Sequence, residues 1–318
     1  MTTARGNAVT FGAKARELMQ ARDLSLRSLA KLTNFDPGHL SRVLNGHKPA
    51  GLELAQRLDD ELAADGTLVA LADERFARAA DTPRRVDTGV LCTVAALLAA
   101  TRRLEDQTSA ATVLPSVRGY LAMTDRFAHE ARGGVRAEAV GLASELTQYA
   151  GWLHVPLRRW TQAERFLDRA AVLGMEADDP QRVTTALSFA AYTAMRREQH
   201  KKAAALSEAA RRDTRVNPGL RTYLTYQAAE ISAADDRGAA YRLLSEAEAM
   251  VDRIDPAELV ESTYWYTPAF FLGTHAFVLD KLGEHERARE LMAESLATLP
   301  EEWRSAEWAE RRRAFLAA

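Results

Sequence analysis

Four sets of mostly small residues recur at one fixed spacing in the second half of the chain. In each set the second member follows the first by 12 residues, and two further members complete it. The sets are Gly151, Ala163, Leu167 and Ala170; Ala191, Ala203, Ser207 and Ala210; Ala228, Ala240, Leu244 and Ala247; and Ala276, Ala288, Met292 and Ser295. Small residues at such offsets let two antiparallel helices approach closely, and stacked pairs bury one continuous core. The spacing therefore predicts a helical solenoid.

The rest of the chain also favours helix. The apolar residues are mostly Ala and Leu and the polar ones mostly Glu and Arg, a mixture with high helix propensity. Residues 89–318 show no strand pattern, only helical segments with short breaks. With 318 residues, the chain is long enough for two or more folding units. We expect an all-α protein.

Residues 10–64 read as a set of short packed helices. Ser25 is placed to cap a helix over 26–33, whose expected apolar side is Leu26, Leu29, Ala30 and Leu32. Asp36 is placed to cap the next helix, which runs to about Leu44 and ends at Asn45-Gly46.

The stretch LSLRSLAKLTNFDPGHLSRVLNGHKP (24–49) resembles the helix-turn-helix of the xenobiotic-response-element (XRE) family, which includes Cro and phage repressors. The resemblance implies five helices, the last supplied by 66–80, with the second helix of the motif in the DNA major groove. The residues expected to contact bases are Arg42, Pro37, Gly38, His39 and Ser41. Arg42 is the first choice, because a guanidinium matches the guanine edge. The residues expected to hold phosphates are Arg27, Ser28, His47 and Lys48.

Local charge agrees with a DNA-binding end. Residues 5–50 carry a surplus of five basic residues, whereas the whole chain has a net charge of −2. Nonspecific attraction to DNA is thus expected at one end of the chain. The alternative is a helix-turn-helix that binds protein or is vestigial, with Arg42 merely solvated.

The repeats resemble tetratricopeptide repeats over roughly residues 140–300. A helix-turn-helix followed by such repeats resembles peptide-sensing quorum regulators and, more closely, actinobacterial regulators of development and antibiotic production. Peptide sensors hold the ligand backbone through asparagines, and here Asn217, in a turn, is the only asparagine after Asn45. The terminal WAERRRAFLAA resembles another repeat or a capping helix, for which Arg311–Arg313 would supply a polar outer face.

A ligand groove is expected on the first helices of the repeats, because aromatics with a few polar groups suit a binding site. The candidates are Gln148, Tyr149, Trp152, Tyr192, Arg196, Tyr223 and Tyr226. The competing interpretation of each is plain core. The aromatic run YWYTPAFF (264–271) and Trp303 and Trp308 carry the same ambiguity between packing and an interface.

These observations predict three parts: a helix-turn-helix domain over 1–80, a linker over 81–88 and a repeat domain over 89–318. The predicted function is a cytoplasmic transcriptional regulator, a repressor, that binds inverted-repeat double-stranded DNA as a homodimer. Its repeats are expected to sense a peptide, small molecule or protein partner. The alternative is an interaction scaffold that acts through the repeats without specific DNA binding.

Other classes of protein are disfavoured. The seven His lack metal-site spacing, and no phosphate loop or nucleophile motif is present, so we expect no metal, no cofactor and no enzyme activity. The longest apolar run, at 90–100, is too short to cross a membrane. The single cysteine, Cys92, fits a reducing compartment and is expected in the core.

Overall fold

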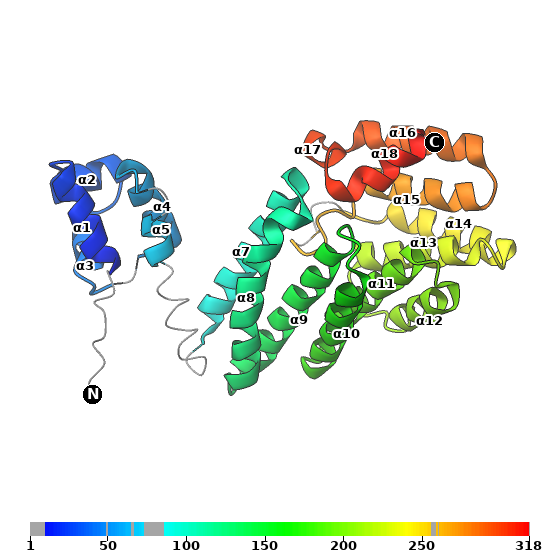
Figure 1. The fold of residues 1–318 in the computed structure, drawn as a ribbon, viewed down its shortest axis with the longest axis horizontal. Coiled ribbons are helices and arrows are strands. Elements are labelled where there is room, and N and C mark those ends of the chain that lie inside the picture. Colours follow the sequence, from blue (N-terminus) through cyan, green and yellow to red (C-terminus); the bar gives the residue numbers. More distant parts are fainter. Residues whose placement is uncertain are drawn as a thin grey trace. The chain divides into compact units, whose positions relative to one another are not determined.

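The computed structural model describes residues 10–48, 50–64, 67–72, 86–255, 259 and 261–317. Within these ranges the chain forms helices and connecting turns and no strand, which confirms the predicted all-α class. The chain divides into two compact units, Met1–Arg85 and Val86–Ala318, shown in Figure 1. Most of the predicted linker (81–85) and the end of the helix expected over 66–80 (73–80) lie outside the described residues.

The first unit contains five described helices around one core. They are α1 (Phe11–Ala21), α2 (Leu26–Thr33), α3 (Pro37–Leu44), α4 (Leu52–Glu61) and α5 (Thr67–Ala72). The predicted caps are confirmed: the Ser25 hydroxyl accepts a hydrogen bond from the Ser28 amide, and the Asp36 carboxylate accepts one from the His39 amide at 2.7 Å. Leu29 and Leu40 are fully buried in the core, whereas Leu32, expected on the apolar side of α2, is 51% exposed.

Helices α1 and α3 approach each other very closely. A Cβ atom added to Gly12 would lie 2.0 Å from the Leu44 carbonyl oxygen, so only glycine fits at this crossing. Four residues further along α1, Arg16 Nη1 donates a hydrogen bond to the same oxygen at 2.5 Å. This contact satisfies a carbonyl that the end of α3 leaves without a partner inside the helix. Helix α1 therefore fixes the position of α3.

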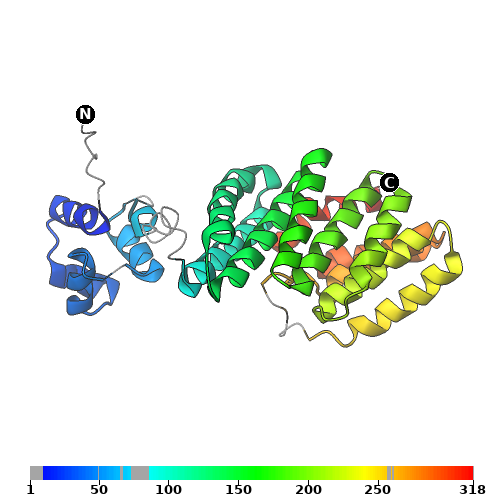
Figure 2. The same cartoon turned by 90° about the horizontal axis from the view of Figure 1, so that it is seen from below.

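The second unit is a stack of helices that run back and forth (Figures 1 and 2). The helices are α7 (Thr88–Gln107), α8 (Ala110–Glu130), α9 (Val135–His154), α10 (Trp160–Glu176), α11 (Pro180–Arg196), α12 (His200–Arg211), α13 (Pro218–Ser232), α14 (Arg237–Val251), α15 (Pro268–Lys281), α16 (His285–Thr298), α17 (Glu301–Arg304), the short 3-10 helix η3 (Glu307–Ala309) and α18 (Glu310–Ala317). Neighbouring helices in the chain are the main packing partners, as expected of a solenoid.

The repeated small residues lie between the two helices of each pair. The first set shows how they meet: a Cβ added to Gly151 on α9 would lie 2.8 Å from Cγ of Leu167 on α10. The later members of all four sets are buried, with Ala163, Ala203, Ala240 and Ala288 at zero exposure. The predicted repeat register and its close helix pairs are confirmed.

The last segment of the chain returns to the first helix pair of the stack. The Glu307 carboxylate accepts a hydrogen bond from the Ala110 amide at 2.8 Å, and Trp308 donates to Asp106 on α7 at 2.9 Å. The prediction that Arg311–Arg313 form a polar outer face is wrong for Arg312, which is 4% exposed. Arg312 is buried because α18 packs against the stack, where the guanidinium bonds to α15 and α16.

One further prediction fails in this unit. Cys92 was expected in the core, but its side chain is exposed on α7. The apolar run around it is an amphipathic helix whose buried side is carried by Leu91, Val94 and Leu98. A helix buries only the positions near its own apolar stripe, and Cys92 falls outside it.

Candidate DNA-binding surface and ligand pocket

Helix α3 divides into a buried face and an open face. Leu40, Val43 and Leu44 pack into the core, each no more than 3% exposed. Pro37, Gly38 and Arg42 are exposed, and His39 and Ser41 are half-buried. The five residues predicted to contact bases therefore share the accessible part of one helix, with Pro37 and Gly38 at its start.

The side chains at the tip of α3 are ordered by local contacts. A Cβ at Gly38 would lie 3.6 Å from Arg42 Nη1, so the guanidinium lies next to the bare backbone of the first turn. The His39 ring stacks on Phe35, with ring centroids 6.2 Å apart. Glycine keeps this tip narrow, and an arginine there can offer two parallel donors to one base edge.

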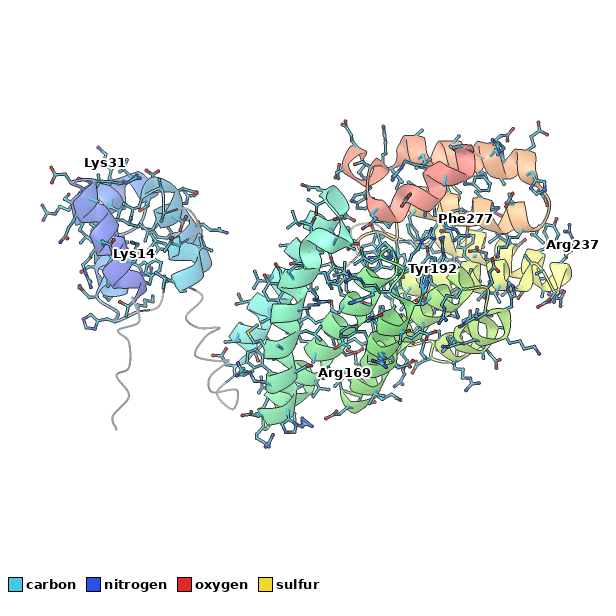
Figure 3. All side chains as sticks on the ribbon, viewed as in Figure 1. Lys14, Lys31, Arg169, Tyr192, Arg237 and Phe277 are labelled. Atoms are coloured by element: carbon cyan, nitrogen blue, oxygen red, sulfur yellow. The ribbon has the colours of Figure 1, made fainter. Side chains whose placement is uncertain are left out.

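The four residues predicted to hold phosphates are all exposed, on either side of α3. Arg27 and Ser28 lie in the first turn of α2, where the Ser28 hydroxyl is also 2.8 Å from that of Ser25. Gly46, with φ of +75°, turns the chain after α3. The amides of His47 and Lys48 both donate to the Arg42 carbonyl, and both residues are exposed. Lys14 and Lys31, labelled in Figure 3, are further cations of this unit.

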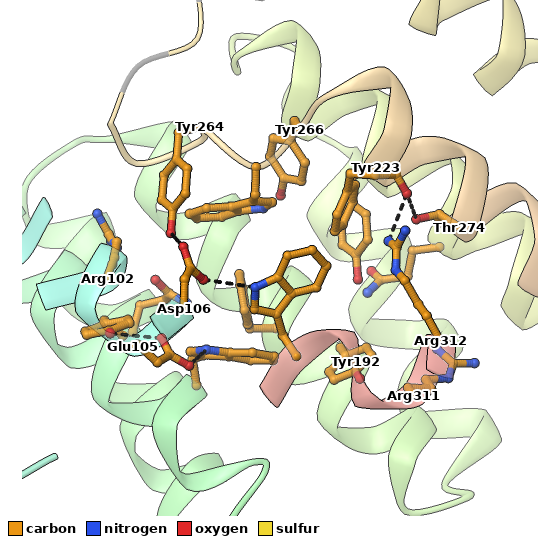
Figure 4. A pocket seen from close by; sticks show the side chains of 18 of the residues that line it. Arg102, Glu105, Asp106, Tyr192, Tyr223, Tyr264, Tyr266, Thr274, Arg311 and Arg312 are labelled. Atoms are coloured by element: carbon orange, nitrogen blue, oxygen red, sulfur yellow. Dashed lines mark hydrogen bonds between the residues drawn. The ribbon is translucent and has the colours of Figure 1, made fainter. Parts of the chain in front are cut away.

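The second unit holds a pocket on the inner side of its stack. The pocket has a cavity volume of about 140 Å³, and about 1060 Å³ of space is free of protein atoms when the part open to solvent is counted. The first helix of every pair contributes to it, and so do the loop before α15, η3 and α18 (Figure 4). The lining consists of Arg102, Glu105, Asp106, Gln148, Tyr149, Trp152, Phe189, Tyr192, Tyr223, Gln227, Glu230, Tyr264, Trp265, Tyr266, Phe270, Thr274, Phe277, Trp308, Arg311 and Arg312.

Five of the seven residues predicted for a groove line this pocket. They are Gln148, Tyr149, Trp152, Tyr192 and Tyr223, and Tyr192 is labelled in Figure 3 together with Phe277 of the same lining. Tyr226 and Arg196 do not line it. Tyr226 is 2% exposed and stacks on Phe271 in the core, while Arg196 is exposed near the end of α11. Tyr226 is therefore a core residue, as the competing interpretation predicted.

The aromatic run before α15 closes one side of the pocket instead of forming an outer interface. Tyr264, Trp265 and Tyr266 lie in the lining, and Trp308 faces them from η3. Asn217, the asparagine noted in the sequence, lies outside the lining, and its carboxamide oxygen accepts from the Gly219 amide at 2.8 Å as the cap of α13.

One end of the pocket carries two adjacent carboxylates from α7. Glu105 accepts hydrogen bonds from the Tyr149 hydroxyl and the Trp152 indole, each at 2.9 Å. Asp106 accepts from the Tyr264 hydroxyl and from the Trp308 indole. Burial raises the pKa of Glu105 to about 7, although its two hydrogen bonds act in the opposite direction. Burial likewise raises the pKa of Asp106.

The other end carries two arginines from α18. Arg311 is paired with Glu230 at 2.6 Å, and its guanidinium lies 3.7 Å from the centre of the Phe277 ring. Arg312 donates to the Ser295 hydroxyl and the Phe270 carbonyl, each at 2.8 Å. Burial lowers the pKa of Arg312 to about 9, and the neighbouring Arg311 charge adds to this effect.

The sequence did not single out the residues at the two ends of the pocket. Glu105 and Asp106 lie in RRLEDQ, which has the polarity of a solvated helix end, and Arg311 and Arg312 were expected to face outward. Trp308 was noted only as an aromatic of ambiguous role. No pattern of spacing within α7 or α18 indicates that they meet.

Two other properties of the described residues bear on function. They contain no group of His, Cys, Asp and Glu arranged to hold a metal ion. Across the same ranges, every helix is too short or too polar to cross a membrane.

Comparisons with known proteins agree with the first unit. A family model described as "Helix-turn-helix domain" matches residues 10–72. No curated protein matches the chain. Among solved structures, the crystal structure of Bacillus thuringiensis PlcR in complex with the peptide PapR7 and DNA is similar, with 13% identity, coverage of 98% of this chain and 100% of that chain, and a TM-score of 0.45. The helix-turn-helix predicted from residues 24–49 is thus confirmed as part of a domain that spans residues 10–72.

Proposed function

We propose that the chain is a transcriptional regulator that binds an inverted-repeat DNA site as a homodimer and represses transcription until a ligand occupies its pocket. The family match to residues 10–72 supports the DNA-binding part. DNA binding rests mainly on the exposed face of α3. Pro37, Gly38 and Arg42 are exposed on this face, whereas the opposite face of the helix is buried in the core.

This face has the shape and the donors that a major groove accepts. A recognition helix contacts base edges with its N-terminal residues. Here that end has no bulky side chain before His39, and Arg42 lies one turn further with its guanidinium beside Gly38. We assign Arg42 to a guanine edge, and His39 and Ser41 to neighbouring bases or phosphates.

The flanking residues suit phosphate contacts. Arg27 is exposed in the first turn of α2, and His47 and Lys48 follow the turn at Gly46. Charges on both sides of α3 would fix its register on the duplex without selecting a sequence. The close crossing at Gly12 and the Arg16 bond hold α3 for this purpose.

Selection of bound sites from random duplex DNA, followed by affinity measurements, tests the proposal. Arg42→Ala should weaken the selected site by about 1–3 kcal/mol while leaving nonspecific DNA nearly unchanged. Arg212→Ala, which removes the same charge from an exposed position of the repeat unit, is the matched control and should leave the selected site unaffected. Equal weakening of selected and nonspecific DNA by Arg42→Ala would refute base reading.

Lys48→Ala tests the phosphate assignment. We expect it to weaken binding to all sequences alike. It should also reduce the slope of log affinity against log salt concentration by about one, because one fewer counterion is released. An altered sequence preference would contradict the assignment.

The homodimer follows from the proposed operator. A two-fold protein on an inverted repeat requires half-sites about one helical turn apart, roughly 34–36 Å between centres. Selection should therefore recover a palindrome, and sedimentation should show a dimer with DNA. Recovery of no palindrome would favour the rival function, an interaction scaffold that acts through the repeats.

The pocket supports the sensing role. It is lined by every first helix of the stack together with the returning C-terminal segment. An occupant that contacts α7 and η3 at once would change how those elements meet, and a ligand shifts a conformational equilibrium only through such differential contacts. Footprinting of the protein's own promoter region, repeated with host-cell extract, tests whether a ligand releases the DNA and whether binding represses transcription.

A further inference from the structure

The two carboxylates that α7 contributes to the pocket form no salt bridge with any described residue. Glu105 and Asp106 are 5% and 6% exposed, yet each accepts hydrogen bonds only from neutral donors, two tyrosine hydroxyls and two indoles in all. Within the described residues, neither forms a salt bridge. Buried ionised carboxylates are normally paired, because an uncompensated charge in a low-dielectric site is costly.

The cations near the pocket are already engaged elsewhere. Arg102 is paired with Glu145 at 2.9 Å, and Arg103 is paired with Glu261. At the far end, Arg311 is paired with Glu230. Among the described residues, the charged side chains of the lining that form no salt bridge are therefore Glu105 and Asp106 at one end and Arg312 at the other. Burial raises the pKa of Asp106, and the charge of Arg103 lowers it in part.

Arg312 is also held by the protein itself. Its guanidinium donates to Ser295 and to the Phe270 carbonyl, and it fills the space beside Gly273, where an added Cβ would meet Arg312 Nη1 at 2.1 Å. The arginine thus closes the gap between α15 and α16. These bonds fix its orientation and use part of its five N–H donors.

A third polar side chain of the lining has an acceptor without a partner among the described residues. Gln227 is 2% exposed and lines the pocket, and its carboxamide nitrogen donates to the Ser188 carbonyl at 3.0 Å. Its carboxamide oxygen is buried and has no hydrogen-bond partner. A buried acceptor without a donor is unfavourable. Because this oxygen is closed off from solvent, a bound donor would reach it only if the Gln227 side chain turned toward the pocket.

The remaining wall is aromatic. Trp152, Trp265 and Trp308 line the pocket together with tyrosines, and each tryptophan contacts a neighbouring ring edge to face or at a tilt. Indole faces attract organic cations through their quadrupole and also accept an apolar body. In Figure 4, Glu105 and Asp106 lie on one side of the lining and Arg311 and Arg312 on the other.

We propose that the pocket binds a small organic cation, a protonated amine on an apolar body, whose N–H groups meet Glu105 and Asp106 while its body lies between the tryptophans. This inference names the ligand class of the sensing site and rests on the proposed sensing role. It predicts an order of affinity in which amines exceed alcohols and carboxylates of the same carbon skeleton.

The experiment titrates the full chain, without DNA, with matched probes. Phenethylamine and hexylamine are the cations, 2-phenylethanol and hexanol the neutral analogues, and phenylacetate and hexanoate the anions. Calorimetry measures binding, and tryptophan emission reports on the pocket because Trp152, Trp265 and Trp308 line it. Trimethylated phenethylammonium, which has no N–H, separates hydrogen bonding from attraction to the rings.

We expect amines to bind, and Glu105→Gln and Asp106→Asn each to weaken them about tenfold or more, as loss of a charge-assisted hydrogen bond does. Amine affinity should rise with pH through about 7 as Glu105 ionises. Glu208→Gln, an exposed carboxylate on α12, is the control and should leave affinity unchanged. Circular dichroism melts establish that each variant is folded.

Three results would overturn the proposal: anions that bind better than amines, amines that bind no better than their alcohols, or amine affinity that is unchanged in both carboxylate variants. These outcomes are separate from the DNA test. Loss of amine binding with intact operator selection refutes only the ligand class, and loss of operator selection with intact amine binding refutes only the regulator.

Discussion

Replacing Gly12 by alanine should destabilise the helix-turn-helix unit, although alanine is the better helix former. A Cβ at this position would lie 2.0 Å from the Leu44 carbonyl oxygen and 2.8 Å from the Leu44 carbonyl carbon. Both are backbone atoms of the end of α3, so no side-chain rotation relieves the contact. Helices α1 and α3 must separate by roughly 1 Å, which also lengthens the Arg16 bond to that oxygen.

The magnitude follows from opposing contributions. Overpacking costs about 1–3 kcal/mol, and loss of a charged hydrogen bond costs about 1.5–3 kcal/mol if it breaks fully. The gain in helix propensity is at most about 1 kcal/mol. We expect a net loss of about 2 kcal/mol, which lowers the Tm of a unit of this size by roughly 8–16 °C.

Differential scanning calorimetry of the full chain measures this change. All five tryptophans lie in the repeat unit, so their emission follows that unit separately. Gly119→Ala is the matched control, because Gly119 lies within α8 with nothing within 4 Å of an added Cβ. The control should raise the Tm of the repeat unit by about 2–4 °C. A Gly12→Ala transition at or above that of the parent would refute the close crossing of α1 and α3.

Three further predictions concern caps and buried charges. Asp36→Ala removes the acceptor for the His39 amide and should lower the Tm of the first unit by about 4–8 °C, equivalent to about 1 kcal/mol; an unchanged transition would contradict the cap. The folded pKa of Glu105, about 7, exceeds its unfolded value, so the stability that its protonation contributes is fully present below about pH 4.5 and lost as pH rises through 7. Denaturant unfolding should show a decline of about 3 kcal/mol across that window, absent in Glu105→Gln. Glu145→Gln should destabilise the repeat unit by about 3 kcal/mol because it leaves the buried Arg102 charge uncompensated, and a change below about 1 kcal/mol would refute that pairing.

The parts that could be predicted from the sequence depend on local chemistry. Ser25 and Asp36 act as caps because their side chains reach amides three residues ahead, within one turn. The repeated alanines are buried because each helix meets the next one along the chain. Such contacts leave their pattern in a short window of residues.

The acidic end of the pocket leaves no such pattern. Asp106 is held by Tyr264 and Trp308, which follow it by 158 and 202 positions. Glu105 and Asp106 look like an ordinary solvated helix end until those distant aromatics cover them. The prediction for Tyr226 fails for another reason. Tyr226 lies three positions after Tyr223 on α13, and the small angle between the two side chains puts Tyr223 in the pocket wall and Tyr226 in the core.

The return of the C-terminal segment to α7 also has a consequence for how the protein is made. An open solenoid folds by adding each repeat to its predecessor, and its contacts stay local in sequence. Here Ala110 and Asp106 obtain their partners from Glu307 and Trp308, near the far end of the chain. During synthesis the early helix pairs can form, but their carboxylate-bearing edge must wait for the last residues to emerge. The pocket is therefore the last part of the repeat unit to exist, and a nascent chain short of η3 has helices but no closed binding site.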